Sequence, residues 1–265
     1  AEDLGAKIIG LGAFTSDVGD GGITIRKNTN IAVTTGNSYT VATAIEGSVK
    51  AAELMGIDVS EAYVAVVGAT GSIGKTCAQA FSRISNHVNL VGRNEDKLNA
   101  LAEDISGNGA KVGTETDVEA GIRHADIVVT VSSAVDAIIE PSFIKKGAIV
   151  CDVARPRDVS VRVQKERDDV LIIEGGVVKV PGDVIFNFNF GFPPGMAYAC
   201  MSETIMLALD GKYEDFTLGK DVTLEQVDEI LAISKKHGFQ LAGFRSFEKA
   251  VTDEQIEDIR RRAGR

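Results

Sequence analysis

Short runs of β-branched and apolar residues alternate with segments of helical spacing from Tyr63 onward. Strands that are covered on both faces have such continuous apolar runs, so the alternation is typical of βαβ units around a buried parallel sheet. Strands are predicted at residues 63–67, 88–92, 126–131, 148–153 and 170–174, and a weaker one at 111–115. The pattern therefore predicts an α/β fold with a Rossmann-like, doubly wound parallel sheet.

Segments of a different character flank this sheet on both sides along the chain. Before it, residues 38–56 place apolar side chains at helical spacing and end at a glycine, which predicts a helix. After it, residues 184–192 read as an extended stretch, and a helix is predicted near 196–209. Capping-box spacing then predicts two more helix starts, at Thr223 with Gln226 and at Thr252 with Gln255.

These boundaries predict three consecutive parts. We expect an N-terminal substrate-side segment with a linking helix at 1–60, a nucleotide-binding domain at 61–180, and a C-terminal segment that carries the nucleophile helix at 181–265. Because the chain begins with Ala1 rather than Met, we also expect further sequence before it.

Composition narrows the function classes. With 38 acidic and 28 basic side chains the net charge is −10, which argues against a nucleic-acid-binding surface. No apolar run is long enough to predict a membrane span and no secretion signal is recognisable, so we expect a cytoplasmic protein. Cys77, Cys151 and Cys200 lie far apart without C-x-x-C spacing, so neither a disulfide framework nor a metal site is expected.

Residues 68–76 satisfy two nucleotide-binding patterns at once. Read from Ala69, they spell A-x-x-x-x-G-K-T, one residue away from the phosphate loop of ATPases, with Lys75 and Asp152 in the roles of its lysine and magnesium ligand. Read from Gly68, they spell G-x-x-G-x-x-G, a variant of the dinucleotide fingerprint. The dinucleotide reading is favoured, because Ala69 replaces the first glycine of the phosphate loop and the surrounding βαβ unit has the length that the fingerprint requires.

The end of the second predicted strand indicates which dinucleotide binds. Arg93 stands where an acidic residue would bind the free 2′-hydroxyl of NAD. A guanidinium instead suits the 2′-phosphate of NADP, because its planar fork binds phosphate oxygens in pairs. We therefore expect NADPH as cofactor. The expected cofactor-binding residues are Gly68, Thr70, Gly71, Ser72, Ile73, Gly74, Arg93, Asn94 and Ser132.

A candidate nucleophile lies in the C-terminal segment. Pro193 and Pro194 end the extended stretch, so Cys200 falls in the first two turns of the next helix. The unpaired N–H groups and the helix dipole at that place favour thiolate over thiol. Spacing alone favours a small buried core residue over a nucleophile. His237, after a later helix, is either a helix-end cation or a proton donor near Cys200.

Two further groups are candidates for substrate binding. Phenylalanines at alternate positions from Phe186 to Phe192 would form one aromatic face of a strand, either facing the core or lining an apolar pocket with Phe188 and Phe190. Thr35, Asn37 and Ser38 precede or begin the predicted helix, where they either contact substrate or cap the helix.

Five motifs together resemble the long-chain acyl-[acyl-carrier-protein] reductases of cyanobacterial hydrocarbon synthesis. They are GLGAFTS (10–16), TTGNSYT (34–40), VAVVGATGSIG (64–74), YACMSET (198–204) and KKHGF (235–239). The resemblance implies reduction of a fatty acyl thioester to a fatty aldehyde with NADPH, through an acyl-enzyme on Cys200. It implies acyl carrier protein or acyl-CoA as substrate, and an aldehyde-consuming enzyme as a further partner. Residues 152–159 are instead more similar to a loop of glutamyl-tRNA reductase-like enzymes.

Two other functions fit the same sequence. A shikimate- or amino-acid-dehydrogenase-like NADP oxidoreductase would share the order of helix and nucleotide domain but would need no nucleophile. A non-catalytic NADP-binding regulator would bind NADPH without turnover. Replacement of Cys200 distinguishes these functions from thioester reduction.

Overall fold

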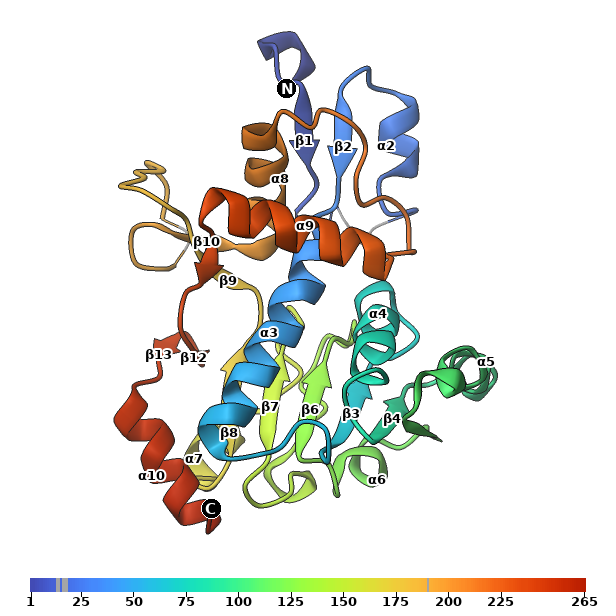
Figure 1. The fold of residues 1–265 in the computed structure, drawn as a ribbon, viewed down its shortest axis with the longest axis vertical. Coiled ribbons are helices and arrows are strands. Elements are labelled where there is room, and N and C mark those ends of the chain that lie inside the picture. The colour runs from blue at the N-terminus through green and yellow to red at the C-terminus, as the bar shows by residue number, and fades with distance from the viewer. Residues whose placement is uncertain (13–14, 16–18, 190) are drawn as a thin grey trace. The chain divides into compact units, whose positions relative to one another are not determined.

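The computed structural model describes residues 1–12, 15, 19–189 and 191–265 (Figure 1). It contains two compact units, each built from two stretches of chain. The first unit comprises Ala1–Thr43 and Gly176–Ala242, and the second comprises Ala44–Gly175 and Gly243–Arg265. This division differs from the three consecutive parts that the sequence suggests, because each unit combines two separate stretches of the chain.

The second unit is built on a six-stranded, fully parallel sheet (Figure 1). Its strands are β3 (Tyr63–Val67), β4 (His87–Val91), β5 (Lys111–Glu115), β6 (Ile127–Thr130), β7 (Ile149–Asp152) and β8 (Leu171–Glu174). They lie in the order β5-β4-β3-β6-β7-β8, which is the 3-2-1-4-5-6 order of the doubly wound dinucleotide-binding fold. The predicted fold class is confirmed, and all six predicted strands occur within two residues of their expected positions.

Helices follow the strands of this unit and begin where the sequence supplies caps. They are α4 (Ser72–Phe81), α5 (Glu95–Ile105), α6 (Val118–Ile122), α7 (Val161–Glu166) and α10 (Asp253–Ala263), with short 3-10 helices at Ser106–Asn108 and Pro141–Phe143. Asn94, Asp117 and Ser160 each accept a backbone N–H of the helix that they precede. The capping box predicted at Thr252 is present at the start of α10.

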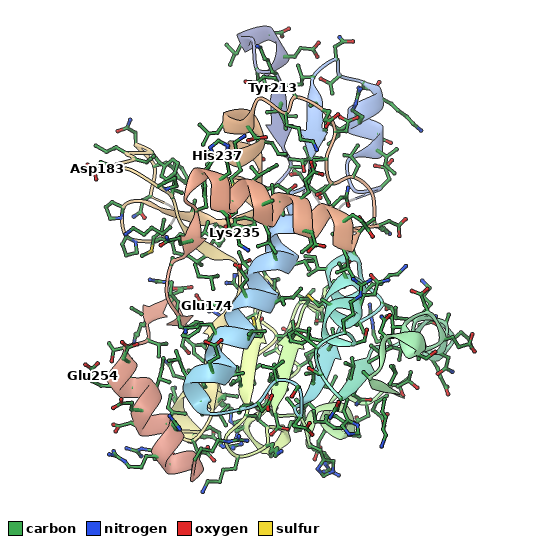
Figure 2. All side chains as sticks on the ribbon, viewed as in Figure 1. Glu174, Asp183, Tyr213, Lys235, His237 and Glu254 are labelled. Atoms are coloured by element: carbon green, nitrogen blue, oxygen red, sulfur yellow. The ribbon has the colours of Figure 1, made fainter. Side chains whose placement is uncertain are left out.

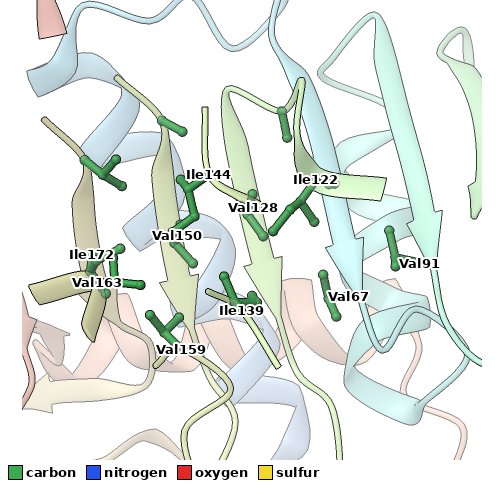
Figure 3. Packing of buried hydrophobic residues seen from close by; sticks show 14 residues of the cluster. Val67, Val91, Ile122, Val128, Ile139, Ile144, Val150, Val159, Val163 and Ile172 are labelled. Atoms are coloured by element: carbon green, nitrogen blue, oxygen red, sulfur yellow. The ribbon is translucent and has the colours of Figure 1, made fainter. Parts of the chain in front are cut away.

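One face of the sheet packs against a large cluster of branched aliphatic side chains (Figure 3). Alternate strand residues such as Val67, Val128 and Val150 enter it and are at most 2% exposed. Ile122, from α6, and Ile139 from a loop pack onto them. Because adjacent β-branched side chains interlock on a pleated surface, this cluster fixes the strand ends from which the nucleotide-binding loops leave.

In its described residues, the first unit combines short strands with helices. Its strands are β1 (Ile8–Gly10), β2 (Ala32–Thr34), β9 (Val177–Lys179), β10 (Met196–Tyr198) and β11 (Gln240–Leu241). Its helices are α2 (Ile23–Lys27), α8 (Ala199–Asp210) and α9 (Leu224–His237), besides a 3-10 turn at Glu2–Leu4. Helix α3 (Asn37–Met55) begins in this unit, and the boundary between the units falls within it. The capping box predicted at Thr223 is present at the start of α9.

The described residues of the aromatic stretch, 184–189 and 191–192, do not form a strand, so that prediction is wrong. Between β9 and β10 the described residues follow an irregular path, and left-handed backbone at Gly182, Asn187 and Gly191 interrupts any extended run. Phe188 is 70% exposed rather than part of one buried aromatic face. Phe190 lies outside the described residues.

Within the part of the chain that the structure describes, no helix combines the length and apolarity that crossing a membrane requires.

Candidate active site

The three glycines of the fingerprint shape the turn between β3 and α4. Gly68 has φ of 81°, a conformation that suits glycine, and a Cβ there would stand 3.0 Å from the backbone of Ser132. A Cβ on Gly74 would stand only 2.2 Å from the carbonyl oxygen of Gly68. These two glycines therefore allow the helix to start directly against the strand and the strand end to touch the loop after β6, as a dinucleotide-binding turn requires.

The first turn of α4 offers donors to a ligand. Gly71 is the N-cap and has no side chain that could satisfy the first N–H groups. The hydroxyl of Ser72 is buried and has no hydrogen-bond partner among the described residues. An anion at this helix start would satisfy both the N–H groups and the hydroxyl, so the residues present fit a pyrophosphate.

Arg93 and Asn94 follow β4, which pairs directly with β3. Arg93 is exposed, and no partner of its guanidinium exists among the described residues. It is therefore available to a phosphate group. The side chain of Asn94 accepts the N–H of Lys97 at 2.9 Å and caps α5, so its structural role accounts for it without a ligand.

Ser132 lies on the opposite side of the turn. Its N–H and hydroxyl both donate to the buried carboxylate of Asp158, at 2.9 and 2.5 Å. Asp158 also accepts the hydroxyl of Thr130 at the end of β6. Asp158 thus holds the loop after β6 against Gly68, a role that the sequence alone does not reveal because 26 residues separate Ser132 and Asp158.

The phosphate-loop interpretation is not supported by the geometry. Asp152 would have to face a magnesium ion, but it is 1% exposed and its carboxylate accepts the backbone N–H groups of Ala154 and Val159. Burial and the neighbouring Asp158 raise its pKa to about 6. Among the described residues there is no cluster of His, Cys, Asp and Glu that could hold a metal ion.

The first unit places Cys200 at the second residue of α8, as the sequence predicts. The side chain is partly buried rather than enclosed in the core. Gly36, with φ of 78°, packs directly on it: a Cβ at Gly36 would stand 2.4 Å from the Cα of Cys200 and 2.5 Å from its Cβ. The glycine of the TTGN motif therefore makes room for the cysteine and brings the start of α3 beside it.

A buried carboxylate holds these two helix starts together. Glu203, one turn after Cys200 on α8, is completely buried. It accepts the hydroxyls of Thr34 and Thr217 at 2.5 and 3.0 Å and the backbone N–H of Tyr39 at 2.8 Å. Burial raises the pKa of Glu203 above its usual value, and the hydrogen bonds from these donors offset only part of the rise. Sequence reasoning missed this residue, although an acid inside an otherwise apolar helix face is a signal for a buried network.

The protein environment raises the pKa of Cys200, contrary to the expectation from its helix position. Burial is the largest cause, and the charge of Glu203 acts in the same direction. The N–H group of Met201 lowers the pKa but does not compensate. The protein environment of Cys200 thus favours the thiol over the thiolate.

Cys77 and Cys151 are core residues, as expected. Both are completely buried, and burial raises the pKa of each thiol. Neither is accessible to a thioester, so Cys200 is the candidate nucleophile.

His237 lies at the C-terminal end of α9 (Figure 2). Its Nε2 is 2.9 Å from the carboxylate of Asp210, the last residue of α8. Cys200 lies ten residues earlier on the same helix, about 15 Å along its axis. His237 is therefore paired with Asp210 at the opposite end of α8 from Cys200, and it does not lie beside the cysteine.

The residues of the TTGN motif differ in their partners. Ser38 is fully buried, and its hydroxyl is 2.7 Å from that of Thr217, so it belongs to the network around Glu203. Thr35 is 1% exposed and its hydroxyl has no partner among the described residues. Asn37 is 7% exposed, and no described residue hydrogen-bonds its amide, which keeps contact with solvent. Thr35 and Asn37 flank Gly36, the residue that packs on Cys200.

The doubly wound sheet and its glycine turn define the class: a protein with a dehydrogenase-type dinucleotide-binding unit. Residues 50–173 match the family model of shikimate / quinate 5-dehydrogenase. The chain is 30% identical over 215 residues to the long-chain acyl-[acyl-carrier-protein] reductase of Synechococcus elongatus, covering 78% of this chain and 61% of that one. These matches and the fold relate the chain to NAD(P)-dependent oxidoreductases.

Two other similar proteins have different names. The chain is 30% identical over 97% of its length to the aminotransferase PigE of a Serratia species, of which it covers 30%. A solved structure of dipicolinate synthase from Bacillus halodurans is 20% identical, with a TM-score of 0.44, over 57% of this chain and 54% of that one. The chain thus spans less than two thirds of each of the two curated relatives.

Proposed function

We propose that the protein reduces a long-chain fatty acyl thioester to a fatty aldehyde with NADPH, through an acyl-enzyme on Cys200. The observation that carries this proposal is the partly buried thiol of Cys200 at a helix start, which packs against Gly36 beside the buried Glu203 network. The similarity to a curated acyl-[acyl-carrier-protein] reductase, which extends over 78% of the chain, supports it.

In the proposed acylation step the sulfur of Cys200 attacks the thioester carbonyl carbon. The C–S bond to the carrier then breaks, and the carrier leaves as a thiolate that takes up the proton lost by Cys200. Because the pKa of Cys200 is raised in the free protein, transfer of this proton must accompany attack or substrate binding. The product of the step is an acyl-enzyme thioester.

In the second step the acyl group must be reduced. NADPH, when bound, supplies the hydride that this reduction needs. Gly68, Gly71 and Gly74 would hold its pyrophosphate at the start of α4, and Arg93 its 2′-phosphate. Reduction expels the sulfur of Cys200 and frees the aldehyde, so the cysteine is regenerated for the next turnover.

Acyl carrier protein and acyl-CoA are the proposed acyl donors, since both present the acyl group on the same type of thioester. Several basic side chains that could bind an acidic carrier are already paired within the chain: Lys236 with Asp210 and Arg262 with Asp168. Lys235 is exposed and remains a candidate contact (Figure 2).

Turnover tests the proposal. The protein is mixed with a long-chain acyl-CoA and NADPH, nucleotide oxidation is followed by absorbance, and the aldehyde is identified by gas chromatography. We expect equal amounts of aldehyde and oxidised nucleotide. NADPH oxidation without aldehyde, or full turnover by Cys200→Ser, contradicts the proposal.

The match to the shikimate / quinate 5-dehydrogenase model supports a second candidate, a hydroxy-acid or amino-acid dehydrogenase. Such an enzyme transfers hydride without covalent catalysis, so Cys200→Ser would retain its activity. The same variant therefore separates the two candidates.

A further inference from the structure

Asn37 carries a side-chain amide that no described residue hydrogen-bonds. The residue as a whole is only 7% exposed. Its amide is not among the fully enclosed unpaired groups, unlike the hydroxyl of Thr35, so the amide keeps contact with solvent. A polar group that is open to solvent and bound to no protein atom is free to bind a ligand.

The position of Asn37 relative to Cys200 follows from Gly36. Gly36 packs on both the Cα and the Cβ of Cys200, and Asn37 is the next residue in the chain. The backbone nitrogen of Asn37 is therefore two covalent bonds from the Cα that faces the cysteine. A carbonyl group attacked by the sulfur would lie in the neighbourhood of this residue.

The start of α3 also supplies backbone donors there. Asn37 and Ser38 are the first two residues of this 19-residue helix, and within the described chain their N–H groups have no acceptor. The next N–H group, that of Tyr39, donates to Glu203 at 2.8 Å. Glu203 thus satisfies the third donor and leaves the first two free, which are the donors nearest to Gly36.

We propose that the side-chain amide of Asn37, together with the N–H groups at the start of α3, binds the oxyanion that forms when Cys200 attacks a thioester. This inference rests on the proposed function. When the new C–S bond forms, the π electron pair of the carbonyl moves to oxygen and creates a negative charge. Donors that are already oriented stabilise this charge without having to reorganise. When the C=O bond re-forms, the carrier thiolate leaves and the charge moves to its sulfur.

The neighbouring residues are less suited to this role. The hydroxyl of Ser38 is occupied by Thr217. Glu203 is an acceptor that would repel an oxyanion, and its carboxylate oxygens already accept the hydroxyl of Thr34 and the N–H of Tyr39. Glu203 is thus a positioning residue, whereas Asn37 is a catalytic one.

The test compares two reactions of the same thiol. Attack on a long-chain acyl-CoA passes through an oxyanion, whereas alkylation by iodoacetamide does not. For Asn37→Ala we expect the single-turnover rate of Cys200 acylation, measured by mass spectrometry without NADPH, to fall by about 10²–10³-fold. The rate of alkylation should stay within about threefold of wild type. Asn28→Ala, which removes an exposed amide of the same unit, should change neither rate.

Thermal unfolding provides the second readout. Because the amide of Asn37 has no partner to lose, Asn37→Ala should leave the melting temperature unchanged or raise it. Acylation of this variant at the wild-type rate overturns the inference. So does an equal loss of acylation, alkylation and melting temperature, because that pattern indicates a structural role. If the wild-type protein is not acylated at all, the proposed function itself fails, and the two failures remain distinguishable.

Discussion

The glycine turn of the second unit and the cysteine site of the first unit share one feature of backbone geometry. They differ in whether local or long-range contacts fix that geometry. In each, a glycine with positive φ stands before a helix and touches backbone from elsewhere: Gly68 beside Ser132 and Gly36 beside Cys200. The turn before α4 lies within one continuous βαβ segment. The cysteine site instead joins residues from three distant stretches through the buried Glu203.

Under the proposed function, this difference separates the cofactor-binding site from the site of covalent chemistry. A phosphate-binding helix start needs only open N–H groups, so a local motif suffices to build it. A nucleophile site must hold several groups in fixed positions, and here a charge buried in the protein provides the connection. Glu203 accepts the N–H group of Tyr39, whereas the N–H groups of Asn37 and Ser38 have no acceptor among the described residues.

Removal of the buried charge should have the largest effect on stability. Glu203→Gln places an amide N–H group against at least one of the donors that now bind the carboxylate. Each buried donor that loses its acceptor costs about 1–3 kcal/mol, so we expect a total loss of about 2–4 kcal/mol in the free energy of unfolding, measured in urea. Glu214→Gln, which removes a surface partner of Lys212, should cost less than about 1 kcal/mol. Equal effects of the two variants would show that the network is not the connecting element.

The same variant tests the electrostatics of Cys200. The charge of Glu203 raises the pKa of the thiol, so its removal should lower that pKa. The thiolate fraction in mildly alkaline buffer then increases, and alkylation by iodoacetamide should become faster in Glu203→Gln. The pH dependence of alkylation measures this directly, provided that the variant is folded by circular dichroism. If the pH profile of alkylation shifts to higher pH in Glu203→Gln, the charge of Glu203 does not raise the pKa of Cys200.

Substitution of Gly74 should distort the turn between β3 and α4. In Gly74→Ala the new methyl group would stand 2.2 Å from the carbonyl oxygen of Gly68, and such overpacking costs about 1–3 kcal/mol. We expect a lower melting temperature and weaker NADPH binding by fluorescence titration. Gly107→Ala is the matched control, because no atom lies within 4 Å of the added methyl group. The geometric account of the turn is wrong if Gly107→Ala is equally harmful.

Arg93→Ala should weaken the binding of NADPH without changing the stability of the protein. Loss of a charge-assisted hydrogen bond to phosphate costs about 1.5–3 kcal/mol, which corresponds to about 10–100-fold in affinity. NADPH affinity should fall by this factor while NADH affinity and melting temperature stay constant. A parallel loss for both nucleotides would exclude a specific contact with the 2′-phosphate.

Asn94→Ala should have the smallest effect of these variants. In contrast to Arg93→Ala, it should lower stability and leave the nucleotide preference unchanged. The side chain caps α5, and loss of such a cap costs about 1 kcal/mol of stability. The preference for NADPH over NADH should not change. If that preference is lost, Asn94 contacts the cofactor in addition to capping the helix.

The sequence predicts the second unit almost completely, because short segments of the chain carry the signals for its strands, helix starts and glycine turn. Apolar runs mark each strand, Asn94 and Thr252 mark helix starts, and the glycine spacing marks the turn. The role of Asp158 stays hidden, since its contact with Ser132 depends on how two loops fold back.

The first unit is predicted less well, for physical reasons. The position of Cys200 at a helix start is predicted correctly, but its raised pKa is not, because burial and Glu203 outweigh the helix dipole. The alternation of phenylalanines suggests a strand from 184 to 192, yet glycines and Asn187 with positive φ bend it. His237 is placed by its contact with Asp210, a partner 27 residues away in sequence.

Intact-protein mass spectrometry tests the central claim most directly. The wild-type protein is incubated with a long-chain acyl-CoA in the absence of NADPH, and the adduct is mapped by peptide analysis. We predict one acyl group on Cys200, its loss when NADPH is added, and no adduct in Cys200→Ser. Absence of any adduct on the wild-type protein, or an adduct on Cys77 or Cys151, would contradict the account.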